Sequence, residues 1–203
     1  MTQFLDVLLI EGRPASAASD ALTAHGHRVH RCHSLDDSSF PCVAVTDPVA
    51  CPIDRGVDVT LVVRRSVNPR PTALEGGVTC AIRARIPIVE DGPTILDPFE
   101  PWLTGRVDGD VNQACLDAAD ARFEPLRHNI AGRTLMPLRA ACIDPASVEC
   151  IIDADRSKLR VRLRGPSIPM RLEQALAVRA LDAVRAFGVT YDKVNVSYES
   201  TGG

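Results

Sequence analysis

The chain has 203 residues, of which 45% are hydrophobic, enough for one medium domain or two small ones with packed cores. Charged residues make up 24% and nearly balance, with 23 Lys and Arg against 26 Asp and Glu and a formal net charge of -3. Because only 4% of residues are aromatic, few side chains could stack on bases, and the composition argues against a dedicated nucleic-acid-binding protein.

The first apolar segment, residues 4–10, is a nearly continuous hydrophobic run that ends at Glu11. It is too short to span a membrane and no basic region precedes it, so we expect a cytoplasmic protein without a membrane partner. Its pattern instead predicts a strand that is buried on both faces.

Strands and helices are predicted to alternate through the rest of the first hundred residues. Helices are expected at 15–24 and 73–84, and further strands at 28–32, 42–45, 57–63 and 86–89. This order predicts an α/β domain over residues 1–97, with a small doubly wound, mostly parallel sheet of receiver-like or Rossmann-like type.

A Pro-rich stretch from Asp91 to Pro101 is expected to end this domain, because proline cannot continue a helix or a central strand. Asp110 is placed to act as the N-cap of a helix that runs to about Arg122, and a second helix is expected at 126–138. Residues 98–146 are therefore predicted to form a helical connector.

The last third of the chain is predicted to form alternating strands and one helix. A hairpin is expected over 148–163, followed by a helix at 170–187 and a strand at 194–198. This order predicts a small α+β module (β-β-α-β) over residues 147–199, with one sheet face under the helix and the other open to water or a partner. An open sheet of this kind also allows a homodimer.

Two loops at the carboxyl ends of the predicted parallel strands contain arginine, at the edge where open α/β sheets bind ligands. Guanidinium groups pair with phosphates and carboxylates, and the amides at the start of the following helices add a positive end. A small anionic ligand is one interpretation, and a solvated rim, which we favour, is the other. The candidate ligand-binding residues are Gly12, Arg13, Arg64, Arg65, Arg70 and Thr72.

The strand-helix pattern of about ninety residues resembles the receiver-like and flavodoxin-like group of doubly wound domains. A receiver has two adjacent acids after its first strand and a phosphate-accepting Asp at the end of its third. Here Glu11 stands alone and Arg64 follows the strand at 57–63. The resemblance therefore implies a degenerate receiver that binds or docks without turnover, because the Mg²⁺ ligands and the nucleophile are missing.

The seven cysteines include no Cys-x-x-Cys pair, which is typical of free thiols in a reducing compartment. One alternative is a zinc site built from His30, Cys32, Cys42 and Cys51, since thiolate and imidazole ligands suit Zn²⁺. We favour core packing for these thiols because the spacing is not that of a zinc motif, and we expect no metal and no cofactor.

Four basic residues alternate with apolar ones along the second strand of the predicted hairpin: Lys158, Arg160, Arg162 and Arg164. In an extended strand all four side chains point to the same side, which makes a stripe that could contact an acidic protein or a nucleic-acid backbone. The alternative, which we favour, is a water-facing row balanced by acids on the neighbouring strands.

The segment from Ser147 to Glu199 is similar to the alkaline-shock protein family in its arrangement. The likeness lies in the Arg-rich strand at 159–163, the helix containing residues 173–178 and the final strand at 194–198. Members of that family are small non-enzymatic α+β proteins linked to stress and envelope functions, so the resemblance implies a role in stress response. This chain departs from the family in carrying an α/β domain and a connector ahead of the segment.

Together these features predict a cytoplasmic, non-catalytic regulatory or adaptor protein that senses a small anion and docks an unidentified protein partner. The first alternative is an enzyme or nucleotide-binding protein that uses the loops at 12–13 and 64–72. The second alternative is a zinc-binding protein. Nucleic acid is not expected as a partner.

Overall fold

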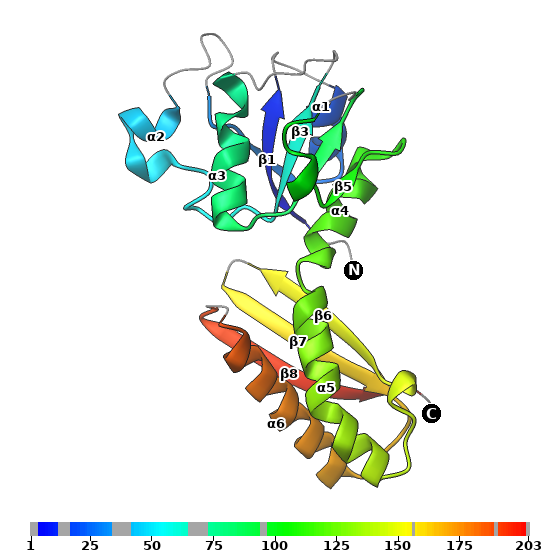
Figure 1. Cartoon of the computed structure of the whole chain (residues 1–203). Coiled ribbons are helices and arrows are strands. Elements are labelled where there is room, and N and C mark those ends of the chain that lie inside the picture. Colours follow the sequence, from blue (N-terminus) through cyan, green and yellow to red (C-terminus); the bar gives the residue numbers. More distant parts are fainter. Residues whose placement is uncertain are drawn as a thin grey trace. The chain divides into compact units, whose positions relative to one another are not determined.

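The computed structural model describes residues 4–11, 17–33, 42–64, 73–93, 97–155, 157–188 and 191–201. The chain divides into two compact units, Met1–Arg122 and Phe123–Gly203, and Figure 1 shows their helices and strands, most of them labelled. Each unit has its own sheet and its own buried apolar core.

The first unit contains a five-stranded sheet in the order β2-β1-β3-β4-β5, and all four strand pairs are parallel. This confirms the predicted α/β class with a parallel sheet. The strand order reverses between β1 and β3. The strands are β1 (Asp6–Glu11), β2 (Arg28–His30), β3 (Val59–Val63), β4 (Ile88–Asp91) and β5 (Gly105–Arg106).

Helices cover both faces of this sheet, because its strands bury side chains on both sides. Along β1, Val7 and Leu9 pack with α1 and α4 on one face, while Leu8 and Ile10 pack with α3 on the other. The helices are α1 (Ala17–Ala24), α2 (Val43–Thr46), α3 (Gly76–Ala84) and α4 (Val111–Ala121), with short 3-10 turns η1 (Pro48–Ala50), η2 (Ala73–Glu75) and η3 (Glu100–Trp102).

Two elements of the first unit differ from the sequence predictions. The short strand expected at 42–45 is the helix α2, because the Val43 amide donates to the Cys32 carbonyl at 2.8 Å and the chain then turns through α2 into η1. Strand β5 lies in the segment predicted as connector. It is only two residues long and begins with a glycine, so no period-2 pattern marks it.

The residues predicted as a helical connector contribute to both units. Helix α4 packs Cys115, Ala118 and Ala119 against the first sheet, whereas the next helix, α5 (Glu124–Ala140), belongs to the second unit. The predicted N-cap is confirmed, since the Asp110 carboxylate accepts hydrogen bonds from the backbone amides of residues 112 and 113.

The second unit has a three-stranded sheet in the order β6-β7-β8, in which β6 and β7 are antiparallel and β7 and β8 are parallel. The strands β6 (Glu149–Asp155), β7 (Lys158–Gly165) and β8 (Lys193–Ser200) and the helix α6 (Met170–Phe187) form the predicted β-β-α-β order, and η4 (Pro145–Ser147) precedes them. This confirms the small α+β module.

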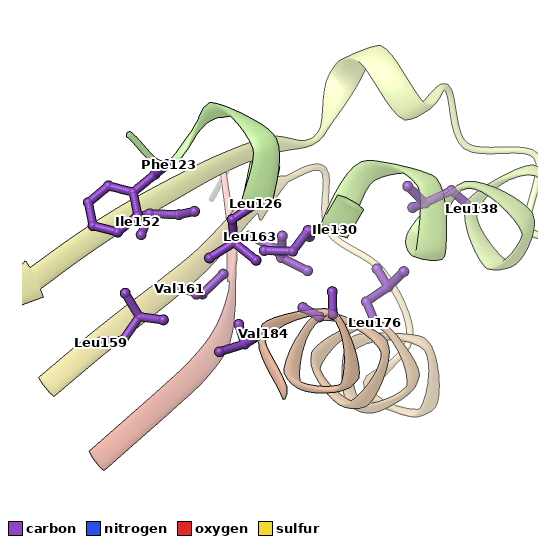
Figure 2. Packing of buried hydrophobic residues seen from close by; sticks show 12 residues of the cluster. Phe123, Leu126, Ile130, Leu138, Ile152, Leu159, Val161, Leu163, Leu176 and Val184 are labelled. Atoms are coloured by element: carbon purple, nitrogen blue, oxygen red, sulfur yellow. The ribbon is translucent and has the colours of Figure 1, made fainter. Parts of the chain in front are cut away.

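Helices α5 and α6 both pack on one face of this sheet. Figure 2 shows Leu126 and Ile130 of α5 and Leu176 of α6 in the same core as Val161 and Leu163 of β7. The strand alternates as predicted, because its odd-numbered residues are buried while the basic residues between them face away from this core.

Candidate functional site

The carboxyl edge of the five-stranded sheet is where ligands bind in open α/β folds, at the point where the strand order reverses. Glu11 ends β1 there, and Arg64 directly follows β3. Arg64 is the one predicted ligand-binding residue that lies within the described part of the chain. The other five candidates lie outside the described residues: Gly12, Arg13, Arg65, Arg70 and Thr72.

The guanidinium of Arg64 is buried and surrounded by carboxylates of the same chain. Its Nη1 lies 3.1 Å from Glu90 Oε1 and 3.2 Å from Asp97 Oδ1, and its Nη2 donates to Glu75 Oε2 at 3.3 Å. Its central carbon also lies 5.7 Å from the centre of the Phe99 ring. The positive charge of Arg64, which we predicted could bind an external anion, is therefore neutralised by carboxylates of the same chain.

A second arginine, Arg106 of β5, joins this group and contacts Glu90, Asp97 and Glu100. Burial lowers the pKa of Arg106, but the hydrogen bond to Glu100 and the neighbouring carboxylates raise it above its ordinary value overall. We call Arg64, Glu75, Glu90, Asp97 and Arg106 the acid-arginine cluster. With three acids against two bases, this cluster disfavours the approach of an anion.

The acidic members of this cluster are not evident from the sequence pattern. Glu90 falls between the strand predicted at 86–89 and the Pro-rich stretch predicted from Asp91, whereas the structure places it inside β4 with 2% of its surface exposed. The signal that points to it is its position near the end of a buried strand, beside the strand that leads into Arg64. A buried charge there requires a partner of opposite sign.

The backbone also fixes the position of Arg64. The Arg64 amide donates to the Asp91 carbonyl at 2.7 Å, and the chain then passes so close that a Cβ on Gly92 would overlap the Arg64 carbonyl oxygen. Gly92 has a φ of +124°, which only glycine adopts at little cost. The backbone that follows β4 therefore packs directly against the backbone at the end of β3.

Glu11, the acid that ends β1, is also paired with a basic side chain. Its Oε1 accepts a hydrogen bond from Arg31 Nη2 at 2.6 Å, and Arg31 donates to Ser19 Oγ at 3.2 Å. A receiver needs free acids at this place to bind Mg²⁺. Across the ranges that the structure describes, no group of three His, Cys, Asp or Glu side chains is arranged to hold a metal ion.

The residues of the zinc alternative are brought together only in part. His30 Nε2 lies 2.7 Å from Asp6 Oδ1, so its ring is engaged by that carboxylate. Cys42, Cys51 and also Cys80 of α3 each lie near Cys32. Burial, followed by these three thiols, raises the pKa of Cys32 to about 12.

The basic stripe of the second unit lies on the sheet face away from α5 and α6. Arg162 donates to Asp153 at 2.7 Å and lies 3.8 Å from Glu199, and Arg164 lies 3.5 Å from the same Glu199. The hydrogen bond to Asp153 raises the pKa of Arg162. These contacts agree with a balanced row at this end of β7, while Lys158 and Arg160 are exposed at its other end.

A hollow of about 370 Å³ opens in the first unit at the amino-terminal ends of β4 and β5. Its walls include Ile82, Pro87, Ile88 and Trp102, with Arg85 also lining it. It lies at the opposite end of the strands from the acid-arginine cluster, so it is separate from the predicted edge.

The chain matches no protein-family model, and no curated protein is significantly similar to it. In the described ranges, no helix combines the length and the apolar character needed to cross a membrane.

Proposed function

We propose that the chain is a cytoplasmic, non-catalytic regulatory or adaptor protein, in which the second unit docks a protein partner. The observation that carries this proposal is the buried Arg64 at the end of β3, held by Glu75, Glu90 and Asp97. A receiver-like unit needs an accessible carboxylate at that place, and a neutralised guanidinium cannot accept a phosphoryl group.

The burial of Glu11 and its pairing with Arg31 support the non-catalytic part of the proposal. Its side chain is 3% exposed and its charge is balanced by Arg31, so it is not free to coordinate Mg²⁺. Incubation with acetyl phosphate and Mg²⁺ tests this directly. We expect the intact mass to stay unchanged, whereas an acid-labile phosphoryl adduct on residues 1–122 would refute the proposal.

The docking part rests on an uneven distribution of charge along the open face of the second sheet. Lys158 pairs in register with Lys193, which places two lysines side by side. Asp153 lies opposite Arg160 in register, but its carboxylate accepts a hydrogen bond from Arg162. Asp155 lies opposite Lys158 in register. This end therefore carries the three bases Lys158, Arg160 and Lys193 against one acid, and its net positive charge would attract an acidic protein surface. A role in stress response is part of the same proposal.

The docking part is tested by charge reversal. Once a partner protein has been identified by cross-linking, Arg160→Glu should weaken its binding at least about tenfold. The salt dependence of the affinity should also be lost, because the attraction is electrostatic. Arg179→Glu is the matched control, since Arg179 is an exposed arginine on α6, which packs on the other face. Equal binding by the two variants would argue against docking through this face.

The small-anion part of the proposal depends on Arg13, Arg65 and Arg70, because Arg64 is already neutralised. A thermal-shift measurement with phosphate and ATP tests it, since a ligand that binds the folded state raises the melting temperature. We expect Arg65→Ala to abolish any such shift. A shift that persists in this variant would assign the anion to another place.

A further inference from the structure

Two cysteines that are ten positions apart lie side by side in the first unit. The Val43 amide donates to the Cys32 carbonyl at 2.8 Å, which brings the backbone of Cys42 next to that of Cys32. Both residues belong to the apolar cluster under α3, and the Cys42 thiol is close enough to contribute to the raised pKa of Cys32. All of these contacts come from described residues on both sides of the segment 34–41.

Two further thiols surround this pair. Cys32 Sγ lies 3.5 Å from the place where a Cβ on Gly77 would stand, and Cys80 is about one helical turn further along α3. Cys51 follows η1 and also lies near Cys32. All seven cysteines are free thiols in the structure.

The two thiols of the close pair differ in their surroundings. Cys32 is 6% exposed and its pKa is about 12, raised first by burial and then by the neighbouring thiols, so it remains protonated at neutral pH. Cys42 is half-buried and therefore more accessible to a reagent. Because the thiolate is the attacking species, Cys42 is the thiol that reacts first with a reagent, and Cys32 must lose its proton before it can close the disulfide.

We propose that Cys32 and Cys42 form a reversible disulfide in response to a small-molecule disulfide such as oxidised glutathione. The Cys42 thiolate attacks one sulfur of oxidised glutathione, which forms a mixed disulfide and releases one glutathione thiolate. The Cys32 thiol then loses its proton and attacks the Cys42 sulfur, which releases the second glutathione. The two cysteine thiols lose two electrons and two protons in total, and the glutathione disulfide gains them.

The described residues meet the geometric requirement of a disulfide better than that of a metal site at the same thiols. A disulfide requires two α-carbons about 4.4–6.8 Å apart, which a pair of backbones joined by one hydrogen bond can provide. A metal site requires at least three converging ligands, and the described residues present none. In a reducing compartment such a disulfide is transient, which suits a regulatory rather than a structural role.

The sequence allows a direct test on the unmodified protein. Trypsin cleaves after Arg31 and Arg55, so Cys32, Cys42 and Cys51 lie in one peptide, while Cys80 lies in the peptide that ends at Arg83. The protein is equilibrated in glutathione redox buffers, blocked with an alkylating reagent, digested and analysed by mass spectrometry. We expect the peptide 32–55 to lose two alkyl adducts and two hydrogen atoms as the buffer becomes oxidising.

Fragmentation between Cys42 and Cys51 locates the bond. The proposal holds if Cys51 keeps its alkyl adduct, and reduction restores all three adducts. A bond to Cys51, or a cross-link to the Cys80 peptide, overturns it. Full alkylation of the peptide at every ratio also overturns it, as does zinc that co-purifies with the protein and protects these thiols.

Variants give an independent readout. Cys42→Ser should prevent the loss of adducts, and Cys142→Ser, which removes an exposed cysteine of the second unit, should not. Because Cys42→Ser could disturb the fold, its Trp102 fluorescence is compared with that of the parent. If Cys42→Ser is folded and Cys32 still loses its adduct, then the pair is wrongly assigned.

Discussion

Nη1 of Arg64 lies 3.1 Å from Oε1 of Glu90, and this buried ion pair joins the end of β3 to β4 at the carboxyl edge of the sheet. The two side chains are 6% and 1% exposed, so water contributes little to their solvation. Each charge is stable there because opposite charges surround it: Glu90 also contacts Arg106, and Arg64 also contacts Glu75 and Asp97.

Removal of the arginine charge should therefore destabilise the first unit strongly. Arg64→Met keeps much of the side-chain volume but leaves the buried carboxylates of Glu75, Glu90 and Asp97 with less compensation. We expect a loss of about 3–5 kcal/mol in the free energy of unfolding. Urea unfolding followed by Trp102 fluorescence measures it, because Trp102 is the chain's single tryptophan and lies in the first unit.

Arg83→Met is the control for this prediction, because Arg83 is an exposed arginine on α3. Its effect should stay within about 0.5 kcal/mol. Similar losses in both variants would show that the pairing of Arg64 does not set the stability of this edge.

The close passage of the chain at Gly92 gives a second prediction. Gly92→Ala would place a Cβ against the Arg64 carbonyl oxygen in a backbone conformation that only glycine tolerates, so we expect a loss of about 2 kcal/mol or more. Gly76→Ala should be neutral or slightly stabilising, because no atom lies within 4 Å of its added Cβ. Thermal unfolding of both variants decides the matter, and a tolerated Gly92→Ala would contradict this account.

The core of the second unit gives a third prediction. Leu176 of α6 is fully buried, and Leu176→Ala should cost about 2–5 kcal/mol through lost contacts and the cavity left behind. Hydrogen exchange of β7 should accelerate, while the Trp102 transition of the first unit stays unchanged. Val178→Ala on the exposed side of the same helix is the control, with 58% of Val178 exposed. Equal acceleration by both variants would refute this assignment of the core.

The decrease in the free energy of unfolding at alkaline pH gives a fourth prediction. Burial raises the pKa of Cys115 from its ordinary 9.0 to about 12, so the folded state keeps a proton that the unfolded state loses above pH 9. Stability from this thiol is fully present below pH 9 and falls by about 1.4 kcal/mol per pH unit between pH 9 and 12.

Cys115→Ala removes this contribution, so the variant should lose stability less steeply than the parent between about pH 9 and pH 10.5. Urea unfolding at a series of pH values measures the two slopes. Below about pH 8 they should coincide, since the thiol is protonated in both states there. Slopes that remain parallel through the alkaline range would contradict the prediction.

Local patterns were sufficient to predict the main strands of both sheets, but they missed β5 and indicated a strand where α2 lies. The apolar runs at β1 and β3 are long enough and sufficiently rich in aliphatic residues to indicate buried parallel strands, and the alternation along β7 fixes its buried face. The cap at Asp110 follows from one residue and its place before an apolar pattern.

The acid-arginine cluster could not be predicted in the same way, because its members come from segments up to 42 positions apart, from Arg64 to Arg106. The pairing of β3 with β4 and of β4 with β5 brings Arg64, Glu90 and Arg106 together, and the segments that connect the strands supply Glu75 and Asp97. The boundary between the two units could not be predicted from the sequence either. Both α4 and α5 have helical patterns, and the pattern does not tell which sheet each helix covers.

The two sheets differ in how far apart their paired strands lie along the chain. Every pair in the first sheet is parallel, so each pairing must wait for an intervening crossover to close. In the second sheet, β6 and β7 follow one another directly as an antiparallel pair, and only the β7–β8 pairing needs a crossover. Short-range pairing of this kind forms faster, so the second unit should complete its sheet more quickly after it is synthesised than the first, although it leaves the ribosome later.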